Sequence, residues 1–271
     1  MDRIRKALDL AREEREASDA GGGAARSFES RAVARLPTVI SYTRTSLFTP
    51  DAAVLESNRI VGASSADPAA AAFRMLRTQV LQRMTENNWR SVAVFSPGSE
   101  DGKTTTAINL AISIANDHRH TVLLVDYDLK RPTIAAKFGL TPKLGADDVL
   151  QGDARVEQCL YHPEGFDRLV LLPARAPMQH SSEALASARS REVVAELRER
   201  YPDRVLVFDL PPILGADDAL AFAPLVECGL MVVAEGSTQR QDLLRSMELL
   251  RNTPIIGTVL NQATDVASAY G

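Results

Sequence analysis

Short apolar runs alternate with longer amphipathic stretches from Trp89 onward. Each run is rich in Val, Leu and Ile, which is typical of strands that are buried on both faces of a sheet. The predicted strands are Val92–Phe95, Val122–Val125, Leu169–Leu172, Val205–Phe208, Leu230–Val233 and Ile255–Val259. The predicted helices lie between them, at 103–116, 190–200, 216–225 and 238–251. This alternation predicts an α/β fold with a mostly parallel central sheet flanked by helices.

The pattern is weaker before Trp89. Residues 3–17 predict a short helix with a thin apolar stripe, and residues 32–66 show no clear period. Asp67 and Pro68 then have the signature of a helix start, with an acidic N-cap and a proline at the first helical position. We expect this helix to reach about Met84 and to turn its apolar side chains inward. Those side chains are Phe73, Leu76, Val80, Leu81 and Met84.

Composition and charge exclude several classes of function. The chain carries 31 basic and 35 acidic residues, a net charge of −4. Such a balance gives no drive toward nucleic acid, so no nucleic-acid partner is expected. No apolar run approaches the roughly 20 residues that span a bilayer, and the charged N-terminus lacks a signal peptide. We therefore expect a cytoplasmic protein with no membrane span, and we expect Cys159 and Cys228 to be free thiols.

A phosphate-binding loop follows the strand Val92–Phe95. Its sequence, Ser96 to Thr104, ends in Gly-Lys-Thr just before a helix that we expect to open at Thr105. Strand, loop, Gly-Lys-Thr and helix form the context in which this motif binds a nucleotide, because successive N–H groups and the helix dipole face the phosphates. Pro97 stands where the strict motif has glycine, so a fortuitous Gly-Lys-Thr remains the alternative. The expected nucleotide-binding residues are Gly98, Ser99, Glu100, Asp101, Gly102, Lys103, Thr104, Thr105 and Asn261.

Two further strands end in acidic residues. The strand Val122–Val125 leads into Asp126 and Asp128, and Val205–Phe208 leads into Asp209. Because parallel strands bring their carboxyl ends to one crevice, these carboxylates should converge beside the loop. There they can hold Mg²⁺ or accept a proton, and Lys103 neutralises the β- and γ-phosphates. The predicted metal ligands are Thr104, Asp126, Asp128 and Asp209, and the predicted catalytic residues are Lys103, Asp126, Asp128 and Asp209.

Other readings of these residues stay open. A strand-end aspartate can also cap a helix or form a turn, and for Asp128 the two interpretations are evenly balanced. Asn261 ends the last predicted strand, where its amide could read the adenine edge or shape a turn. With ATP and Mg²⁺ as the expected cofactors, the chain divides into an N-terminal helix and flexible arm (1–66), a P-loop ATP-binding domain (67–262) and a short mobile tail (263–271).

These motifs resemble those of the bacterial tyrosine kinases of capsule and exopolysaccharide loci. Val122–Pro132 (VLLVDYDLKRP) is similar to the family's second Walker-type motif, and Val205–Pro212 (VLVFDLPP) is similar to its Walker B segment. Three further segments resemble the family: Phe73–Met84 (FRMLRTQVLQRM), Thr104–Leu110 (TTTAINL) and Gly257–Asn261 (GTVLN). The N-terminal segment Ile4–Arg15 resembles the subgroup found with an exosortase. The resemblance covers about residues 67–262 well.

The resemblance implies a kinase domain that autophosphorylates on tyrosine and works with a membrane polysaccharide chain-length regulator (a Wzz-like protein) at the inner face of the membrane. It implies that Lys103 and Thr104 bind phosphate and Mg²⁺, that Asp128 and Asp209 help to hold the metal, and that Asp126 is a metal ligand and the base for the tyrosine hydroxyl. The family forms rings through an E-x-x-R-x-x-R helix. Arg74 and Arg77 match that helix, but Ala71 replaces the acid, so we expect a weakened homo-oligomer.

Three functions are compatible with the motifs. The first is the tyrosine autokinase, and the second is a regulatory ATPase switch of the same export system that phosphorylates no tyrosine. The third is a partitioning ATPase, which needs a lysine where this chain has Gly98.

The family usually carries a tyrosine cluster in its tail, whereas this tail has Tyr270 alone. We expect weak autophosphorylation, chiefly on Tyr270 and secondarily on Tyr42. Tyr127 lies inside the acidic motif and Tyr201 is expected to pack, while Tyr161 is expected to follow a helix and to be half exposed.

Overall fold

The computed structural model describes residues 45–61, 68–200 and 203–263. An eight-stranded sheet runs through this part of the chain in the order β1-β4-β5-β3-β6-β2-β7-β8. All neighbouring strands are parallel except β4 and β5. The strands are β1 (Ser46–Phe48), β2 (Ser91–Phe95), β3 (Thr121–Asp126), β4 (Tyr161–Pro163), β5 (Leu169–Leu172), β6 (Arg204–Asp209), β7 (Cys228–Ala234) and β8 (Ile255–Asn261). The predicted α/β fold with a mostly parallel sheet is confirmed.

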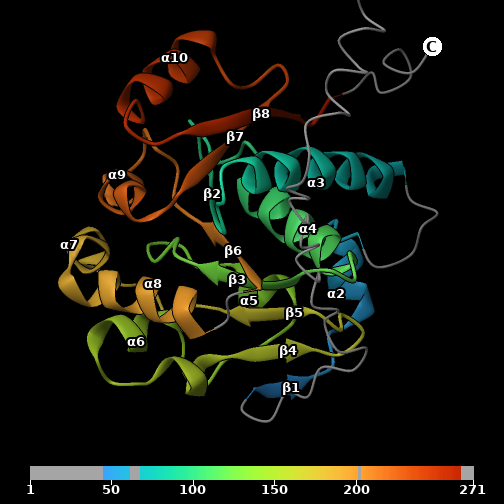
Figure 1. Cartoon of the computed structure of the whole chain (residues 1–271), viewed down its shortest axis with the longest axis vertical. Coiled ribbons are helices and arrows are strands. Elements are labelled where there is room, and N and C mark those ends of the chain that lie inside the picture. The colour runs from blue at the N-terminus through green and yellow to red at the C-terminus, as the bar shows by residue number, and fades with distance from the viewer. Residues whose placement is uncertain (1–44, 62–67, 201–202, 264–271) are drawn as a thin grey trace, which may run out of the picture. The chain divides into compact units, whose positions relative to one another are not determined.

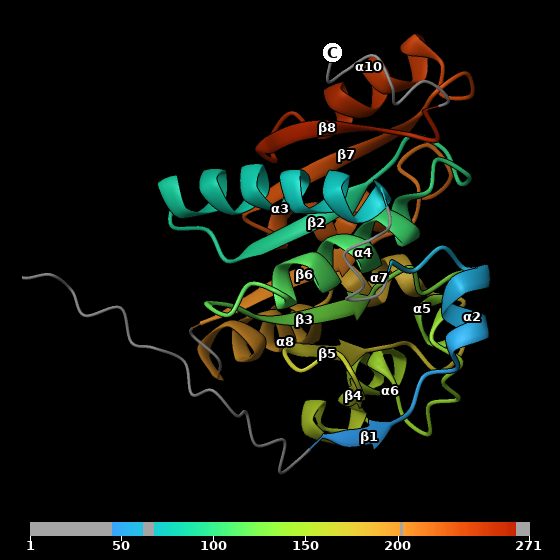
Figure 2. The same cartoon turned by 90° about the vertical axis from the view of Figure 1, so that its right-hand side faces the viewer.

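Helices cover both faces of the sheet (Figures 1 and 2). The helices are α2 (Ala52–Ser57), α3 (Pro68–Glu86), α4 (Lys103–Ala115), α5 (Ile134–Lys137), α6 (Ala146–Gln151), α7 (Ser181–Ala186), α8 (Ala188–Arg200), α9 (Asp218–Phe222) and α10 (Arg240–Leu249). Two short 3-10 helices, η1 (Val156–Cys159) and η2 (Ala223–Leu225), complete the set. Among the described helices, none is both long and apolar enough to cross a bilayer.

Two apolar cores result, one on each side of the sheet. Side chains that alternate along each strand point to opposite faces. Val92 and Val94 therefore join the core under α3, α4 and α5, whereas Ala93 and Phe95 join the core under α6 to α9. Both flanks are thus covered, which explains why the strands read as continuous apolar runs in the sequence. Cys159 and Cys228 are buried free cysteines, as expected.

Two short strands extend the sheet beyond the predicted elements. Ser46–Phe48 pairs in parallel with Tyr161–Pro163, and backbone bonds from Ser46 N to Leu160 O and from Glu164 N to Phe48 O, both 2.9 Å, close the pair. Residues 45–61 were expected to be part of a loosely ordered arm with short elements. In the structure, Ser46–Phe48 forms the edge strand of the sheet and Ala52–Ser57 forms α2. Tyr161 follows the 3-10 helix η1, as expected, and starts β4. The expectation that it is half exposed is wrong, because it is only 6% exposed.

Several predictions lie outside the described residues. They are the helix at 3–17, residues 264–271 of the predicted tail (263–271), and the environments of Tyr42, Tyr201 and Tyr270. The predicted helix from residue 68 is confirmed and ends at Glu86, with Val80, Leu81 and Met84 buried. Phe73 and Leu76, also predicted to face inward, are half-buried.

Candidate nucleotide-binding site

Strand order brings the predicted site residues together. β6 lies between β2 and β3, so the loop after β2 faces the carboxyl ends of both acidic strands. The register pairs Asp126 of β3 directly with Asp209 of β6, and Tyr127 N donates to Asp209 O at 2.9 Å. Two carboxylates therefore lie side by side at the crevice where ligands bind in open parallel sheets.

Lys103 is the central cation of this crevice. Its side chain is 4% exposed, and Nζ lies 2.6 Å from Oδ1 of Asp209 and 3.8 Å from Oδ2 of Asp128. Nζ also lies 3.2 Å from the hydroxyl of Thr104. Helix α4 begins at Lys103, where the predicted helix 103–116 begins, so the lysine and the threonine lie in the first turn of that helix. A buried ammonium is stable here because a carboxylate neutralises it.

The three aspartates have different environments. Asp126 and Asp209 are fully buried, whereas the Asp128 side chain is 14% exposed. Oδ2 of Asp126 accepts N–H bonds from Thr133 (3.1 Å) and Ile134 (3.0 Å). Burial raises the pKa of Asp126 well above its usual range, and the neighbouring Asp209 charge adds to the rise. Burial also raises the pKa of Asp128, and Lys103 partly offsets that rise.

Glycine is required at the end of the loop. Gly102 has a φ of 83°, in the left-handed region that other residues rarely adopt. A Cβ atom at this position would lie 1.9 Å from Nδ2 of Asn261. Asn261 uses that nitrogen to donate to Asp101 O at 2.9 Å, and Gln262 Nε2 donates to Glu100 O at the same distance. The end of β8 therefore holds the loop through these two hydrogen bonds. The sequence patterns did not predict the one made by Gln262.

The rest of the loop is held by its own side chains and by the segment after β6. Ser96 Oγ donates to Gly98 O at 2.6 Å, and Ile213 N donates to Ser96 O at 2.9 Å. The side chain of Asp101 is 4% exposed and is directed at Gly98 N and at Thr238, a residue that no sequence motif indicated. Ser99 and Glu100 are exposed, and Thr104 and Thr105 are half-buried at the start of α4.

The side chains present fit a magnesium nucleotide. Oδ1 of Asp126 and Oδ2 of Asp209 are buried and have no hydrogen-bond partner among the described residues. Nucleotide-bound Mg²⁺ typically takes one or two carboxylates in addition to phosphate oxygens and water. In the described ranges, no group of three or more His, Cys, Asp or Glu side chains could hold a metal ion. Phosphate oxygens and water would therefore have to supply the other ligands of Mg²⁺. Thr104, Asp128 and Asp209 are the oxygen donors nearest to Lys103 in this arrangement.

The sequence profile of the CobQ/CobB/MinD/ParA nucleotide binding domain (CbiA) matches residues 92–270. The chain belongs to this nucleotide-binding family. The matched range contains the loop, Lys103 and all three aspartates of the crevice, so the geometry described above is that of a nucleotide-binding domain of this family.

Several proteins similar to this chain are named tyrosine kinases. The chain is 28% identical over 191 residues to tyrosine-protein kinase YwqD of Bacillus subtilis (strain 168), covering 70% of this chain and 79% of YwqD. It is 31% identical over 216 residues to the succinoglycan biosynthesis transport protein ExoP of Rhizobium meliloti (strain 1021), covering 76% of this chain but 26% of ExoP.

Among solved structures, the crystal structure of the VpsO kinase domain matches with a TM-score of 0.64 and 30% identity. The match covers 72% of this chain and 95% of that domain. The similarity therefore extends over nearly the whole of a solved kinase domain, whereas this chain spans about a quarter of the length of the longer curated relative ExoP.

Proposed function

We propose that this chain is a cytoplasmic protein tyrosine autokinase that uses Mg-ATP and regulates exopolysaccharide or capsule synthesis and export. The observation that carries the proposal is the 2.6 Å pair of Lys103 with Asp209 beside Asp126, in a chain that covers 79% of a relative named as a tyrosine kinase. A P-loop lysine paired with a buried carboxylate is suited to phosphoryl transfer, which depends on positioning and on charge stabilisation rather than on covalent chemistry.

Each part of the crevice has a proposed role. The backbone N–H groups of residues 99–105 would hold the phosphates, since the N–H of Gly98 is bonded to Asp101, and Lys103 would neutralise their charge. Thr104, Asp128 and Asp209 would hold Mg²⁺, with Asp126 as a further ligand. When bound, the metal neutralises the charge that develops on the phosphates. Asn261 would contact the base edge with its amide, one N–H of which already donates to Asp101 O.

Asp126 is the proposed base for the tyrosine hydroxyl. One of its oxygens is fixed by the N–H groups of Thr133 and Ile134, so the carboxylate has a defined orientation. The other oxygen has no hydrogen-bond partner within the described residues and is therefore available to accept a proton. Burial raises the pKa of Asp126, and a base is most effective when its pKa approaches the working pH.

The proposed partner is a membrane chain-length regulator of polysaccharide export. The support for it is that ExoP, a protein named for succinoglycan transport, contains a segment similar to this chain within a much longer sequence. We propose that this chain is recruited to the inner face of the membrane by such a regulator, and that it self-associates weakly.

Incubation of the purified chain with Mg-ATP, followed by a phosphotyrosine immunoblot, tests the proposal. We expect a signal that is absent in Asp209→Asn and unchanged in Asp153→Asn, a matched control at an exposed aspartate. ATP hydrolysis without any phosphotyrosine would favour the regulatory ATPase switch instead. Loss of the signal in both variants would indicate that the effect is not specific to the crevice.

A further inference from the structure

A buried carboxylate connects the phosphate loop to a distant turn. Oδ2 of Asp101 accepts the N–H of Gly98 at 2.7 Å, and Oδ1 accepts the hydroxyl of Thr238 at 2.6 Å. Asp101 is 4% exposed, so both bonds are made away from solvent. An ionised carboxylate can only accept, and therefore the hydroxyl of Thr238 must be the donor.

Thr238 is itself fixed by the sheet. Its Oγ1 accepts the N–H of Ala234, the last residue of β7, at 2.8 Å. The backbone N–H of Thr238 donates to Ala234 O at 3.0 Å, which closes the turn that leads into α10. A relay of hydrogen bonds thus runs from the end of β7 through Thr238 and Asp101 to Gly98.

The relay lies in the wall of a pocket next to the loop. This pocket has a volume of about 580 Å³, and its wall is built from residues 97–101, from the segment after β6 and from the start of α10. Thr238 and Ser237 both line it, but the Ser237 side chain is exposed and has no hydrogen-bond partner among the described residues. Of these two adjacent hydroxyls, that of Thr238 is bonded both to the loop and to the end of β7, whereas that of Ser237 is bonded to neither.

We infer that Thr238 is a positioning residue for the nucleotide: through Asp101 it fixes the conformation of residues 98–101 and thereby raises the affinity for ATP. A loop whose N–H groups are already oriented loses less conformational freedom when phosphate binds. Without the hydroxyl, the Asp101 carboxylate loses one of its two donors and its hold on Gly98 weakens. The inference rests on the proposed binding of a nucleotide, and it does not require that the chain phosphorylates tyrosine.

Thr238→Val removes the hydroxyl and keeps the shape of the side chain, Thr238→Ser keeps the hydroxyl, and Ser237→Ala is the matched control. By calorimetric titration with Mg-ADP, we expect Thr238→Val to raise Kd about tenfold, as for one lost hydrogen bond to a charged group. Thr238→Ser and Ser237→Ala should remain within about twofold of the unsubstituted chain. A Kd that is unchanged in Thr238→Val, with only a lowered melting temperature, would overturn the inference.

Hydrogen exchange without nucleotide gives an independent test. A peptide spanning residues 96–104 should exchange faster in Thr238→Val than in the unsubstituted chain, and Ser237→Ala should not change it. Combining Thr238→Val with Asp101→Asn should raise Kd no further than the more severe single substitution, because both interrupt one relay. Additive effects, or equal exchange in Thr238→Val and Ser237→Ala, would show that Thr238 does not position the loop.

Discussion

Lys103 and Asp209 are 106 positions apart in the chain, yet Nζ of the lysine lies 2.6 Å from Oδ1 of the aspartate. The pair joins the first turn of α4 to the end of β6 at the centre of the crevice. Removing the lysine leaves Asp126 and Asp209 buried beside each other without a cation, so a variant at Lys103 must be checked for an intact fold.

Lys103→Ala and Asp209→Asn should each lower phosphotransfer by about 10²-fold or more, since each removes a charge or donor directed at the transition state. Initial rates with Mg-ATP measure the effect, and circular dichroism checks the fold. Lys143→Ala is the matched control at an exposed lysine. ATP turnover that is unchanged in either crevice variant, with the fold intact, would remove the proposed roles of both residues.

Much of this crevice could be predicted from the sequence because its residues follow strong strand patterns. The strand Leu169–Leu172 has the bounds that its apolar run predicted, and Asp126 and Asp209 each end a predicted strand. The local sequence pattern did not predict β1 and β4, because each has only three residues and is defined by its pairing with the other. The contact of Thr238 with Asp101 was also beyond local pattern, because it depends on the placement of β7 beside β2.

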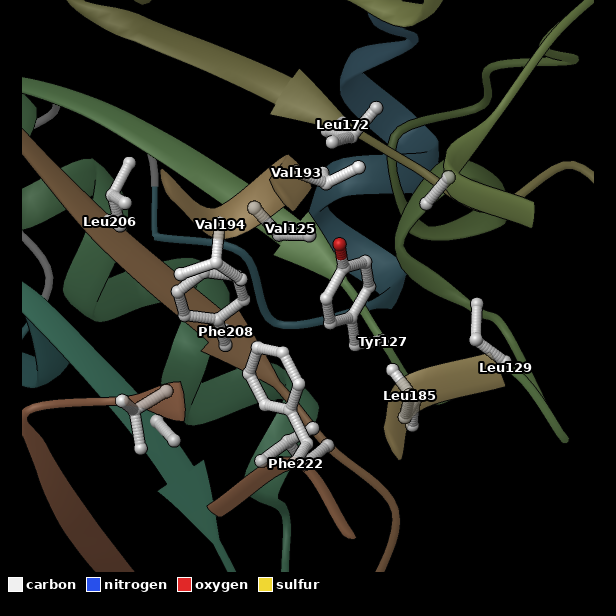
Figure 3. Close-up of a cluster of buried hydrophobic side chains, with 14 of the residues drawn as sticks. Val125, Tyr127, Leu129, Leu172, Leu185, Val193, Val194, Leu206, Phe208 and Phe222 are labelled. Carbon is white, nitrogen blue, oxygen red and sulfur yellow. The ribbon is translucent and has the colours of Figure 1, made fainter. Parts of the chain in front are cut away.

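Tyr127 and Tyr161 are both buried, but their hydroxyls have opposite environments. The hydroxyl of Tyr127 has no hydrogen-bond partner in the described part of the chain. The ring packs against Phe208 and Phe222, and the hydroxyl points the other way, toward Val193 (Figure 3). The hydroxyl of Tyr161 accepts from Lys143 N at 2.9 Å and donates to Leu144 O at 3.0 Å.

Replacing these tyrosines by phenylalanine should therefore change stability in opposite directions. Tyr127→Phe removes a buried hydroxyl that is not hydrogen-bonded and should raise the free energy of unfolding by about 1 kcal/mol, whereas Tyr161→Phe should lower it by roughly 1–3 kcal/mol. Thermal melts should show shifts of about 2–4 °C per kcal/mol. If the two variants melt at the same temperature, the hydroxyl environments described here do not determine stability.

Self-association should be limited by Ala71. Ala71 and Arg74 are exposed on α3, while Arg77 donates to Ser113 O at 3.1 Å and is engaged within its own chain. Ala71→Glu would add a carboxylate that can pair with an arginine of a second copy, and close charge pairs at interfaces couple by at least about 1.5 kcal/mol.

Light scattering at micromolar concentration should therefore show a larger assembly for Ala71→Glu. Ala72→Glu is the control, because it adds the same charge one position away on another side of α3. A stable ring of the unsubstituted chain that persists in an Arg74→Ala, Arg77→Ala double variant would contradict the expectation of weak association.

The structure narrows the choice of phospho-acceptor. A tyrosine phosphorylated by a second copy must enter that copy's crevice, and neither described tyrosine is accessible, since Tyr127 is 0% exposed and Tyr161 is 6% exposed. Tyr42, Tyr201 and Tyr270 remain, and we expect modification chiefly on Tyr270 and secondarily on Tyr42. Mass spectrometry after incubation with Mg-ATP identifies the sites. Strong modification that persists in a Tyr270→Phe, Tyr42→Phe double variant would contradict this assignment, and Tyr201→Phe would then show whether the third tyrosine accepts the phosphate.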